Sequence, residues 1–527
     1  MRPILSLLPA LLLASLSAAS AAPAAAQPSD AASAGPAPAL YAQHCASCHG
    51  ATRLGGMGPA LLPENLGRLK PAEALATIRD GRAATQMPAF GARFDAAQLQ
   101  ALADFVYTPP AVAPVWGIDE IRASRTFDAE AARLPARPVF DADPRNLFVV
   151  VELGDHHVTV LDGDRFRPLT RFASRFALHG GPKFSPEGRF VYFCSRDGWV
   201  TKYDLWNLRT VAEVRAGINA RNLAVSDDGR FVMVANYLPQ TLVLLSADEL
   251  APLKLYPVAD AAGHGSRVSA VYTAAPRGSF VAALKDVQEV WEIPYRDDLP
   301  PVHAGPMQDD RAGAAGRSAA LEPRRIALDD VLDDFFFDPA YRHLIGASRD
   351  GGKGQVIDLD AGTRVATLDL PGMPHLGSGI TWEWQGRPVL ATPNLKESAI
   401  TVIDMTNWQV IKRIPTLGPS FFMRSHAQLD TAWIDVSLGR ERDAMQLIDK
   451  NTLEIRTTIR PQPGRTAAHV EFTQDGRQAL ISIRERDGAL VVLDTQSLTE
   501  ITRLPMAMPS GKYNVHNKIT RDAGTSH

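Results

Sequence analysis

The chain has 527 residues, of which 45% are hydrophobic and 21% charged, values that are ordinary for a folded protein and exclude disorder or a coiled coil as its main state. Lys and Arg together number 55 and Asp and Glu 58, so the net charge of −3 gives no support for nucleic-acid binding. The 3 cysteines are too few for a disulfide framework, and 39 Gly with 39 Pro favour many short strands joined by turns.

The N-terminus has the pattern of an export signal. Arg2 precedes a mostly apolar run over residues 4–16, and three alanines end at Ala26, before Gln27. The run is about 13 residues long, which is short for a membrane-spanning helix. We therefore expect cleavage after Ala26, a disordered leader over 27–37, and a soluble periplasmic protein with no membrane span in the mature chain.

The next feature is a short cysteine motif, Cys45-Ala46-Ser47-Cys48-His49, which matches the C-x-x-C-H attachment sequence of c-type haem. The thiols of Cys45 and Cys48 would bond the haem, and His49 would bind its iron. A zinc site would need a second ligand pair at similar spacing, and the sequence has none. The motif predicts a covalent haem c.

A sixth iron ligand is expected downstream. Met87 lies in the segment Thr85–Phe90, before an apolar pattern over 95–106 that predicts a helix. Met57 is the alternative, only eight residues after His49, and we favour Met87. His and Met ligation raises the haem potential and closes the iron to other ligands. A small all-α class I cytochrome c domain over 38–108 would then transfer electrons, followed by a linker over 109–139.

A repeat of 40 to 50 residues begins after residue 140. Each unit has β runs separated by turns, and its third strand ends at a recurrent position. These ends are predicted near Asp162, Asp204, Ser246, Ile293, Asp358, Asp404, Asp449 and Asp494. Eight four-strand units bury their faces around one axis, which predicts an all-β eight-bladed β-propeller over 140–527. Residues 511–515, at the C-terminal end, would complete a blade together with N-terminal residues of the repeat region and so close the ring. Met307–Pro323 would be an insertion between blades four and five.

The connections between successive blades should meet at one rim of the axis, where propellers bind ligands. They carry four histidines and four arginines: His179, His264, His375, His469, Arg221, Arg267, Arg424 and Arg465. Arginines bind carboxylates through two parallel hydrogen bonds, so the set predicts a pocket for a porphyrin-like ligand with several carboxylates. We interpret His156, His157, His264, His343 and His516 as structural or peripheral.

A c-type domain followed by an eight-bladed propeller resembles the cytochrome cd1 nitrite reductase family, which includes proteins of haem d1 biosynthesis. The resemblance rests on the segments Phe176–His179, Gly217–Arg221, Met373–His375 and Pro509–Val515. It implies that His179 is the proximal ligand of a haem d1-type molecule and that Arg221 contacts its side chains. His375 corresponds to one of two distal histidines of the reductases.

The chain departs from the reductases at two places. Asp333, followed by Asp334, stands where they have the other distal histidine, and a carboxylate there would repel nitrite. His469 stands where the reductase pattern has no histidine. This combination resembles the dehydrogenase branch of the family, which implies oxidation of a propionate of dihydro-haem d1 to acrylate in the last step of haem d1 biosynthesis.

Roles in that reaction follow from the residue types. His469 would be the distal iron ligand or the catalytic base, with His375 as second choice for the catalytic role. Arg221, Arg267, Arg424 and Arg465 would hold carboxylates. Asp333 is either a solvated loop residue or faces the pocket.

Alternatives remain open at this point: a nitrite reductase with an altered pocket, or a haem d1 carrier without chemistry. The predicted c-type haem argues against a carrier, which needs no electron outlet. The expected partners are dihydro-haem d1 or haem d1 held non-covalently, a periplasmic electron acceptor, and cytochrome cd1 nitrite reductase as recipient of the product.

Overall fold

The computed structural model describes residues 36–56, 58–67, 69–82, 87–178, 180–296, 320–348 and 352–520. The predicted signal sequence, Met57, His179 and most of the predicted insertion lie outside these ranges. In the part of the chain that the structure describes, no helix has the length and apolar character needed to cross a membrane.

The N-terminal part is helical. It consists of α1 (Pro36–His44), α2 (Ala46–His49), α3 (Pro63–Leu66), α4 (Pro71–Asp80) and α5 (Ala96–Tyr107). Helix α5 begins at an Asp95 cap whose Oδ1 accepts the N–H of Gln98 at 2.8 Å. Its apolar face, at helical spacing, is buried against Tyr41 and Phe90. The helix predicted over 95–106 is confirmed, and α1 begins two residues inside the segment predicted to be a disordered leader.

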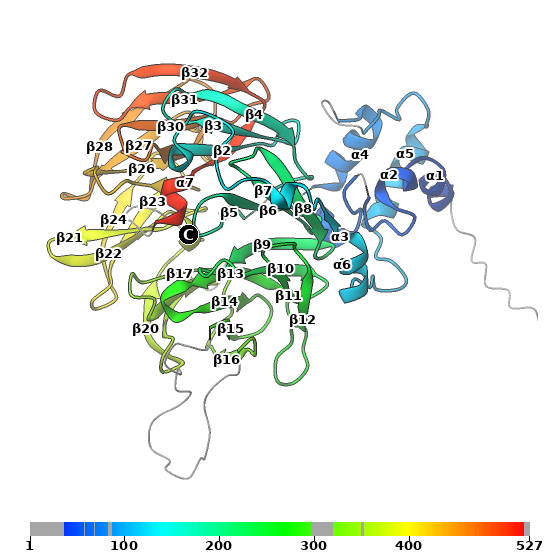
Figure 1. Ribbon diagram of the computed structural model, residues 1–527, viewed down its shortest axis with the longest axis horizontal. Helices are drawn as coiled ribbons and strands as arrows, with labels where there is room; N and C mark the ends of the chain where they lie inside the picture. Colours follow the sequence, from blue (N-terminus) through cyan, green and yellow to red (C-terminus); the bar gives the residue numbers. More distant parts are fainter. Residues whose placement is uncertain are drawn as a thin grey trace, which may run out of the picture.

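The rest of the chain forms eight antiparallel sheets arranged in a ring (Figure 1). Blade one holds β33 (Pro509–Asn514), β2 (Leu147–Glu152), β3 (His157–Asp162) and β4 (Arg167–Ala173). Blade two holds β5 (Lys183–Phe184), β6 (Phe190–Cys194), β7 (Trp199–Asp204), β8 (Arg209–Arg215) and, on its outer edge, β1 (Thr126–Phe127). Blade three holds β9 (Asn219–Val225), β10 (Phe231–Leu238), β11 (Thr241–Ser246) and β12 (Pro252–Pro257). Blade four holds β13 (Val268–Ala274), β14 (Ser279–Leu284), β15 (Glu289–Pro294) and β16 (Arg324–Ala327).

The remaining blades repeat this order along the chain. Blade five holds β17 (Asp334–Phe337), β18 (His343–Ala347), β19 (Lys353–Asp358) and β20 (Thr363–Asp369). Blade six holds β21 (Ile380–Trp384), β22 (Arg387–Thr392), β23 (Ala399–Asp404) and β24 (Gln409–Pro415). Blade seven holds β25 (Met423–Arg424), β26 (Thr431–Asp435), β27 (Met445–Asp449) and β28 (Glu454–Ile459). Blade eight holds β29 (Ala467–Phe472), β30 (Gln478–Ile483), β31 (Gly488–Asp494) and β32 (Glu500–Met506).

The recurrent aspartates at the ends of third strands make the turn into the fourth strand. In blade two, Asp204 Oδ1 accepts the N–H groups of Trp206 and Asn207 at 2.9 and 3.1 Å. The aspartates that end β3, β19, β23, β27 and β31 accept backbone N–H groups in the same way. The predicted register of the repeats is confirmed. The predicted insertion was misplaced, because β16 follows it and puts it inside blade four, between the third and fourth strands.

Alternate side chains on the inner strands pack against different neighbours, which explains their long apolar runs. In β2, Val149 and Val151 belong to the core shared with blade two, while Phe148 and Val150 belong to the core shared with blade eight. Both faces of each sheet are covered by a neighbouring blade. Successive side chains of an inner strand therefore point into two different cores, and neither set points into solvent.

The two ends of the repeat region meet in blade one. Strand β33 pairs with β2 in antiparallel register, with Lys512 opposite Val150. This pairing closes the ring and leaves no free inner edge, as predicted. The short helix α7 (Val515–Ile519) follows β33 directly.

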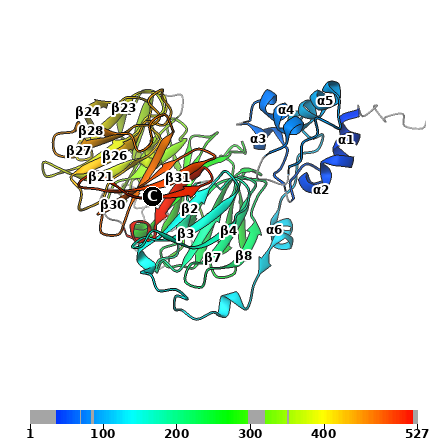
Figure 2. The ribbon, with the colours of Figure 1, turned by 90° about the horizontal axis from the view of Figure 1, so that it is seen from above.

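The helical part lies against one side of the propeller (Figures 1 and 2). Ala60 and Leu62 pack on Ile218, in the connection between blades two and three. Asn65 Nδ2 donates a hydrogen bond to the carbonyl of Ile218 at 2.9 Å, and Asn219 Nδ2 donates one back to the backbone carbonyl of Glu64 at 3.1 Å. The segment between the two parts contains α6 (Ile118–Ser124), which packs on β8 and β12.

Candidate functional site

The haem-attachment motif lies at the turn between α1 and α2, and His49 is buried. Its Nδ1 donates a hydrogen bond to the carbonyl of Pro59 at 2.7 Å, so Nε2 is the nitrogen that can bind iron. Burial lowers the pKa of His49, which favours the neutral form that a metal ligand requires. A Cβ on Gly58 would lie 2.7 Å from the His49 ring, so this position needs glycine.

Met87 lines the same cavity as Cys45, Cys48 and His49. Two thiols, one oriented imidazole and one thioether around a single cavity fit a covalent haem with His and Met ligands. The rival ligand, Met57, lies outside the described residues.

One cavity of about 1450 Å³ extends from these residues to the axis of the propeller. Its other end is lined by His375, Arg424 and His469. The volume exceeds the 300–1,000 Å³ usual for small-molecule sites, as expected for a space that spans two large ligands. The haem-attachment residues and the centre of the propeller therefore belong to one site.

His375 lies in the connection between blades five and six. Its Nδ1 donates a hydrogen bond to the carbonyl of Phe421 at 2.8 Å, and its Nε2 is 3.9 Å from Asp334 Oδ2. Burial lowers the pKa of His375, although the Asp334 carboxylate opposes this shift. This geometry repeats that of His49: a carbonyl holds Nδ1, which leaves Nε2 as the nitrogen that can bind a metal.

His469 has a different environment. Only 1% of it is exposed, and its ring packs edge-on against Phe422 and Tyr513, with centroids at 4.6 and 5.4 Å. Within the described ranges, neither ring nitrogen has a hydrogen-bond partner. Burial lowers the pKa of His469 well below its ordinary value, and the positive charges of Lys512, Arg424 and Lys518 add to the effect. The result is a neutral imidazole that can accept a proton.

Local backbone geometry directs His469 towards the axis. The register of β29 against β30 shifts between Ala468 and Val470, which leaves His469 as an extra residue at a bulge. Its φ is +49°, a left-handed value that side chains other than glycine seldom adopt.

Three of the four predicted arginines line the cavity. Arg221 Nε donates to the carbonyl of Ser269 at 3.0 Å, and Arg267 Nη2 pairs with Asp286 at 2.6 Å. Arg424 is buried, and in the described chain its Nε has no hydrogen-bond partner. Arg465 does not line the cavity, because it turns outward and pairs with Asp487 at 2.5 and 2.8 Å.

The two acidic residues of the blade four to five connection both line the cavity. Asp333 forms an ion pair with Lys285. Asp334 Oδ2 accepts the N–H of Gly377 at 2.7 Å, and the hydroxyl of Tyr272 donates to its Oδ1 at 3.3 Å. Of the two possibilities left open for Asp333, the structure has the one in which it faces the pocket.

His179 lies outside the described residues, but both of its neighbours line the cavity. Leu178 bridges to Ser195 on one side. Gly180, on the other, has φ +82°, and a Cβ there would lie 2.5 Å from that of Asn222. His264, by contrast, is an exposed residue that bonds to Asp260 at 2.9 Å, as interpreted from the sequence.

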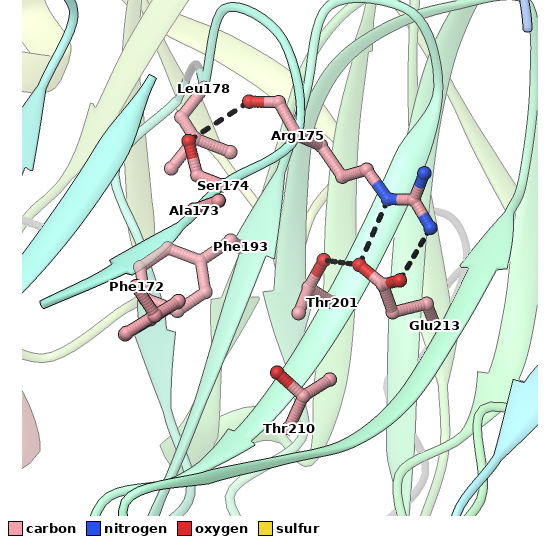
Figure 3. Close-up of a pocket in the computed structure, with 9 residues that line it drawn as sticks. All are labelled: Phe172, Ala173, Ser174, Arg175, Leu178, Phe193, Thr201, Thr210 and Glu213. Atoms are coloured by element: carbon pink, nitrogen blue, oxygen red, sulfur yellow. Dashed lines mark hydrogen bonds and ion pairs between the residues drawn. The ribbon is translucent and has the colours of Figure 1, made fainter. Parts of the chain in front are cut away.

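A second, smaller cavity of about 350 Å³ lies beside Leu178, which lines both spaces (Figure 3). Here Arg175 Nε donates to Glu213 Oε1 at 2.9 Å, and Thr201 Oγ1 donates to the same atom at 2.7 Å. These bonds tie the segment that leads to His179 onto blade two.

Sequence reasoning missed several residues of the cavity, and two of them lie close to the histidines and aromatic rings of the propeller end. Tyr513 was noted only as part of a family-like segment, yet it adjoins His469, and burial raises its pKa to about 12, so the phenol stays protonated. His156 was interpreted as peripheral, yet it lines the cavity and packs on Phe176 at 5.0 Å. The only signal for Tyr513 was its place on the closing strand, and His156 gave none.

Family models match nearly the whole described chain. The "Cytochrome D1 heme domain" model matches residues 142–310 and 315–518, and the "Cytochrome C oxidase, cbb3-type, subunit III" model matches 32–106. The chain belongs to the cytochrome D1 haem domain family. The family predicted from the sequence is thus confirmed, together with its covalent haem c domain.

Two relatives and one solved structure align with this chain over most of their length. Dihydro-heme d1 dehydrogenase of Pseudomonas aeruginosa is 59% identical over 498 residues, which are 94% of this chain and 97% of the relative. The solved structure of Dihydro-heme d1 dehydrogenase NirN in complex with DHE superposes with a TM-score of 0.86, at 59% identity, over 92% of this chain and 100% of that one. Nitrite reductase of Stutzerimonas stutzeri is 23% identical, over 91% of this chain and 92% of the relative.

Proposed function

We propose that this protein is a dihydro-haem d1 dehydrogenase, which oxidises one propionate side chain of dihydro-haem d1 to acrylate. One observation carries the proposal: a single cavity joins the haem-attachment residues to a neutral imidazole at the centre of the propeller, His469, which has no hydrogen-bond partner in the described part of the chain. The high identity to the P. aeruginosa dehydrogenase supports the same reaction.

The residues of the cavity suit an anionic macrocycle. Arg221, Arg267 and Arg424 all line it, and guanidinium groups bind carboxylates through paired hydrogen bonds. The Arg424 Nε that lacks a partner in the described chain is a buried donor, and such donors are seldom left unsatisfied in a working site. The substrate carboxylates would satisfy it.

The reaction converts a CH2–CH2 unit to CH=CH and releases two protons and two electrons. His469 accepts one proton from the propionate carbon, because its imidazole is neutral and has no hydrogen-bond partner among the described residues, and the second proton passes to solvent. The protonated phenol of Tyr513, beside it, can donate a hydrogen bond to the side chain being oxidised. The covalent haem supplies a one-electron outlet when bound, and an external one-electron acceptor removes both electrons in succession.

Two further histidines, His375 and His179, hold the macrocycle. His375, with Nδ1 on the Phe421 carbonyl, is oriented to bind iron from the distal side. We assign His179 to the proximal side. The sequence left open whether His469 is the iron ligand or the base. Of His375 and His469, His375 is the one whose ring is held by a backbone carbonyl, as metal-binding histidines commonly are, so we assign iron binding to His375 and proton transfer to His469.

The setting of the reaction is part of the proposal. The export signal and haem attachment favour the periplasm, and the product would pass to cytochrome cd1 nitrite reductase. Asp333, paired with Lys285 inside the cavity, disfavours nitrite reduction, because a carboxylate repels that anion.

The test is anaerobic incubation of the purified holoprotein with dihydro-haem d1 and an oxidised one-electron acceptor. We expect the tetrapyrrole to lose two hydrogen atoms by mass and to take on the absorbance of haem d1. Unchanged tetrapyrrole would refute the proposal. Nitrite turnover by the protein loaded with haem d1, in place of dehydrogenation, would support a reductase.

A further inference from the structure

Asp435 is a fully buried carboxylate at the end of β26, outside the cavity lining and without a role in the reaction described above. Its Oδ1 accepts the N–H groups of Phe421 and Phe422, at 2.9 and 3.2 Å. Its Oδ2 accepts the N–H of His469 at 3.0 Å. One side chain of blade seven therefore joins the connection that leads into its own blade to the inner strand of blade eight.

These three bonds reach two histidines at the propeller end of the cavity, His375 and His469. His469 is held directly, through its own backbone N–H. His375 is held through Phe421, whose carbonyl accepts the bond from His375 Nδ1 at 2.8 Å. Phe422, fixed by the same carboxylate, packs edge-on against the His469 ring.

Lys512 binds the backbone carbonyl of His469, whereas Asp435 binds its backbone N–H. Lys512 lies on the closing strand β33 and is fully buried. Its Nζ donates hydrogen bonds to the carbonyl of His469 and to Ser482 Oγ, the latter at 2.7 Å. The bulge and the left-handed φ of His469 are thus fixed on the N–H side by Asp435 and on the carbonyl side by Lys512. A strained backbone of this kind persists only where its surroundings over-determine it.

We propose that Asp435 and Lys512 are positioning residues, which hold the His469 imidazole at the substrate carbon through its backbone. The inference rests on the proposed function, in which His469 is the base. Neither residue lines the cavity, so neither contacts the tetrapyrrole. Catalytic groups must be held within a fraction of an ångström, and small displacements can cost about 100-fold in rate.

The decisive variant is Asp435→Asn, which keeps the volume but replaces one acceptor oxygen with a donor. We expect conversion of dihydro-haem d1 to slow about 10- to 100-fold. Affinity, measured by absorbance titration with dihydro-haem d1, should fall much less than the conversion rate, because the arginines are untouched and Asp435 holds His375 only indirectly, through Phe421. A wild-type conversion rate in this variant would overturn the proposal.

A double-mutant cycle separates positioning from a general structural role. If Asp435 acts through His469, Asp435→Asn slows the wild type but has no further effect in a His469→Ala background. An equal slowing in both backgrounds would overturn the proposal. The wild-type protein is the reference. If it fails to convert dihydro-haem d1, the proposed function is wrong, and this outcome is distinct from a failure of the positioning proposal.

A matched control is Asp404→Asn. Asp404 is also a buried aspartate at the end of a strand, and its Oδ1 accepts the N–H of Thr406 at 2.8 Å, outside the cavity. The Asp404→Asn variant should convert substrate at the wild-type rate. If it is slowed as much as Asp435→Asn, the proposal is contradicted. If Asp435→Asn does not accumulate as folded holoprotein, Lys512→Met takes its place in the same cycle, with the same outcomes.

Discussion

The two ends of the central cavity are built in opposite ways. At the haem-attachment end, the two thiols and the imidazole come from one stretch, Cys45 to His49, and His49 is oriented by Pro59 ten residues later. The thioether of Met87 is added from further along the chain. The propeller end is assembled from residues between Val151 and Tyr513, carried by connections and strands of different blades. A contiguous motif specifies its chemistry locally, whereas the second site exists only after the ring has closed.

This contrast implies a division of labour. The helical end should control where electrons go and have little effect on how tightly the tetrapyrrole binds. The propeller end should control binding and proton transfer and leave the covalent haem intact. Variants at each end can therefore be compared by two readouts, conversion and affinity.

The largest effect is expected from Cys45→Ser combined with Cys48→Ser. Without its thioether bonds the haem is not retained covalently, so the electron outlet is lost and conversion falls to the rate without enzyme. Affinity for dihydro-haem d1 should stay close to wild type, since the propeller residues are unchanged. Conversion at an undiminished rate, followed by mass spectrometry, would show that electrons leave by another route.

His469→Ala should give the next largest effect. Loss of a positioned base slows proton transfer by roughly 10²–10⁴-fold. Binding and covalent haem content should persist. His264→Ala is the control, because His264 is exposed and lies outside the cavity lining. If the two variants convert substrate equally fast, the base lies elsewhere, and His375 becomes the candidate.

A smaller effect should distinguish two similar arginines. Arg267 and Arg465 each form a two-bond pair with an aspartate, but only Arg267 lines the cavity. Arg267→Gln should weaken dihydro-haem d1 binding about five- to tenfold, or ~1 kcal/mol, through loss of a charged hydrogen bond. Arg465→Gln should bind like wild type. Equal weakening in the absorbance titration would mean that the arginines act through long-range charge alone.

The smallest expected effect is that of pH on conversion. Burial and the charges of Lys512, Arg424 and Lys518 lower the pKa of His469, so the imidazole stays neutral as the pH falls through 6.5, the ordinary histidine value. The rate should therefore be flat across that value and decline only at lower pH, when the imidazole becomes protonated. A decline centred on 6.5 would indicate a solvent-exposed base.

The same contrast explains what the sequence could predict. The Cys-x-x-Cys-His motif and the aspartates that end the third strands act through neighbours a few residues away, so their spacing alone was informative. The direction of a rim side chain depends on its surroundings. Arg465 turns outward to Asp487, and His469 turns inward because Asp435 and Lys512 hold its bulge, partners that are 22, 34 and 43 residues distant.

The central claim is that oxidation of dihydro-haem d1 at the propeller end of the cavity passes electrons to the covalent haem at the other end. Rapid anaerobic mixing of dihydro-haem d1 with an excess of the oxidised protein tests this most directly, because two covalent haems are then available to accept the two electrons of each conversion. The absorbance of the covalent haem and the mass of the tetrapyrrole are followed together. We predict that the covalent haem is reduced as the acrylate forms and that His469→Ala slows both equally. Acrylate that accumulates while the covalent haem stays oxidised would contradict the account.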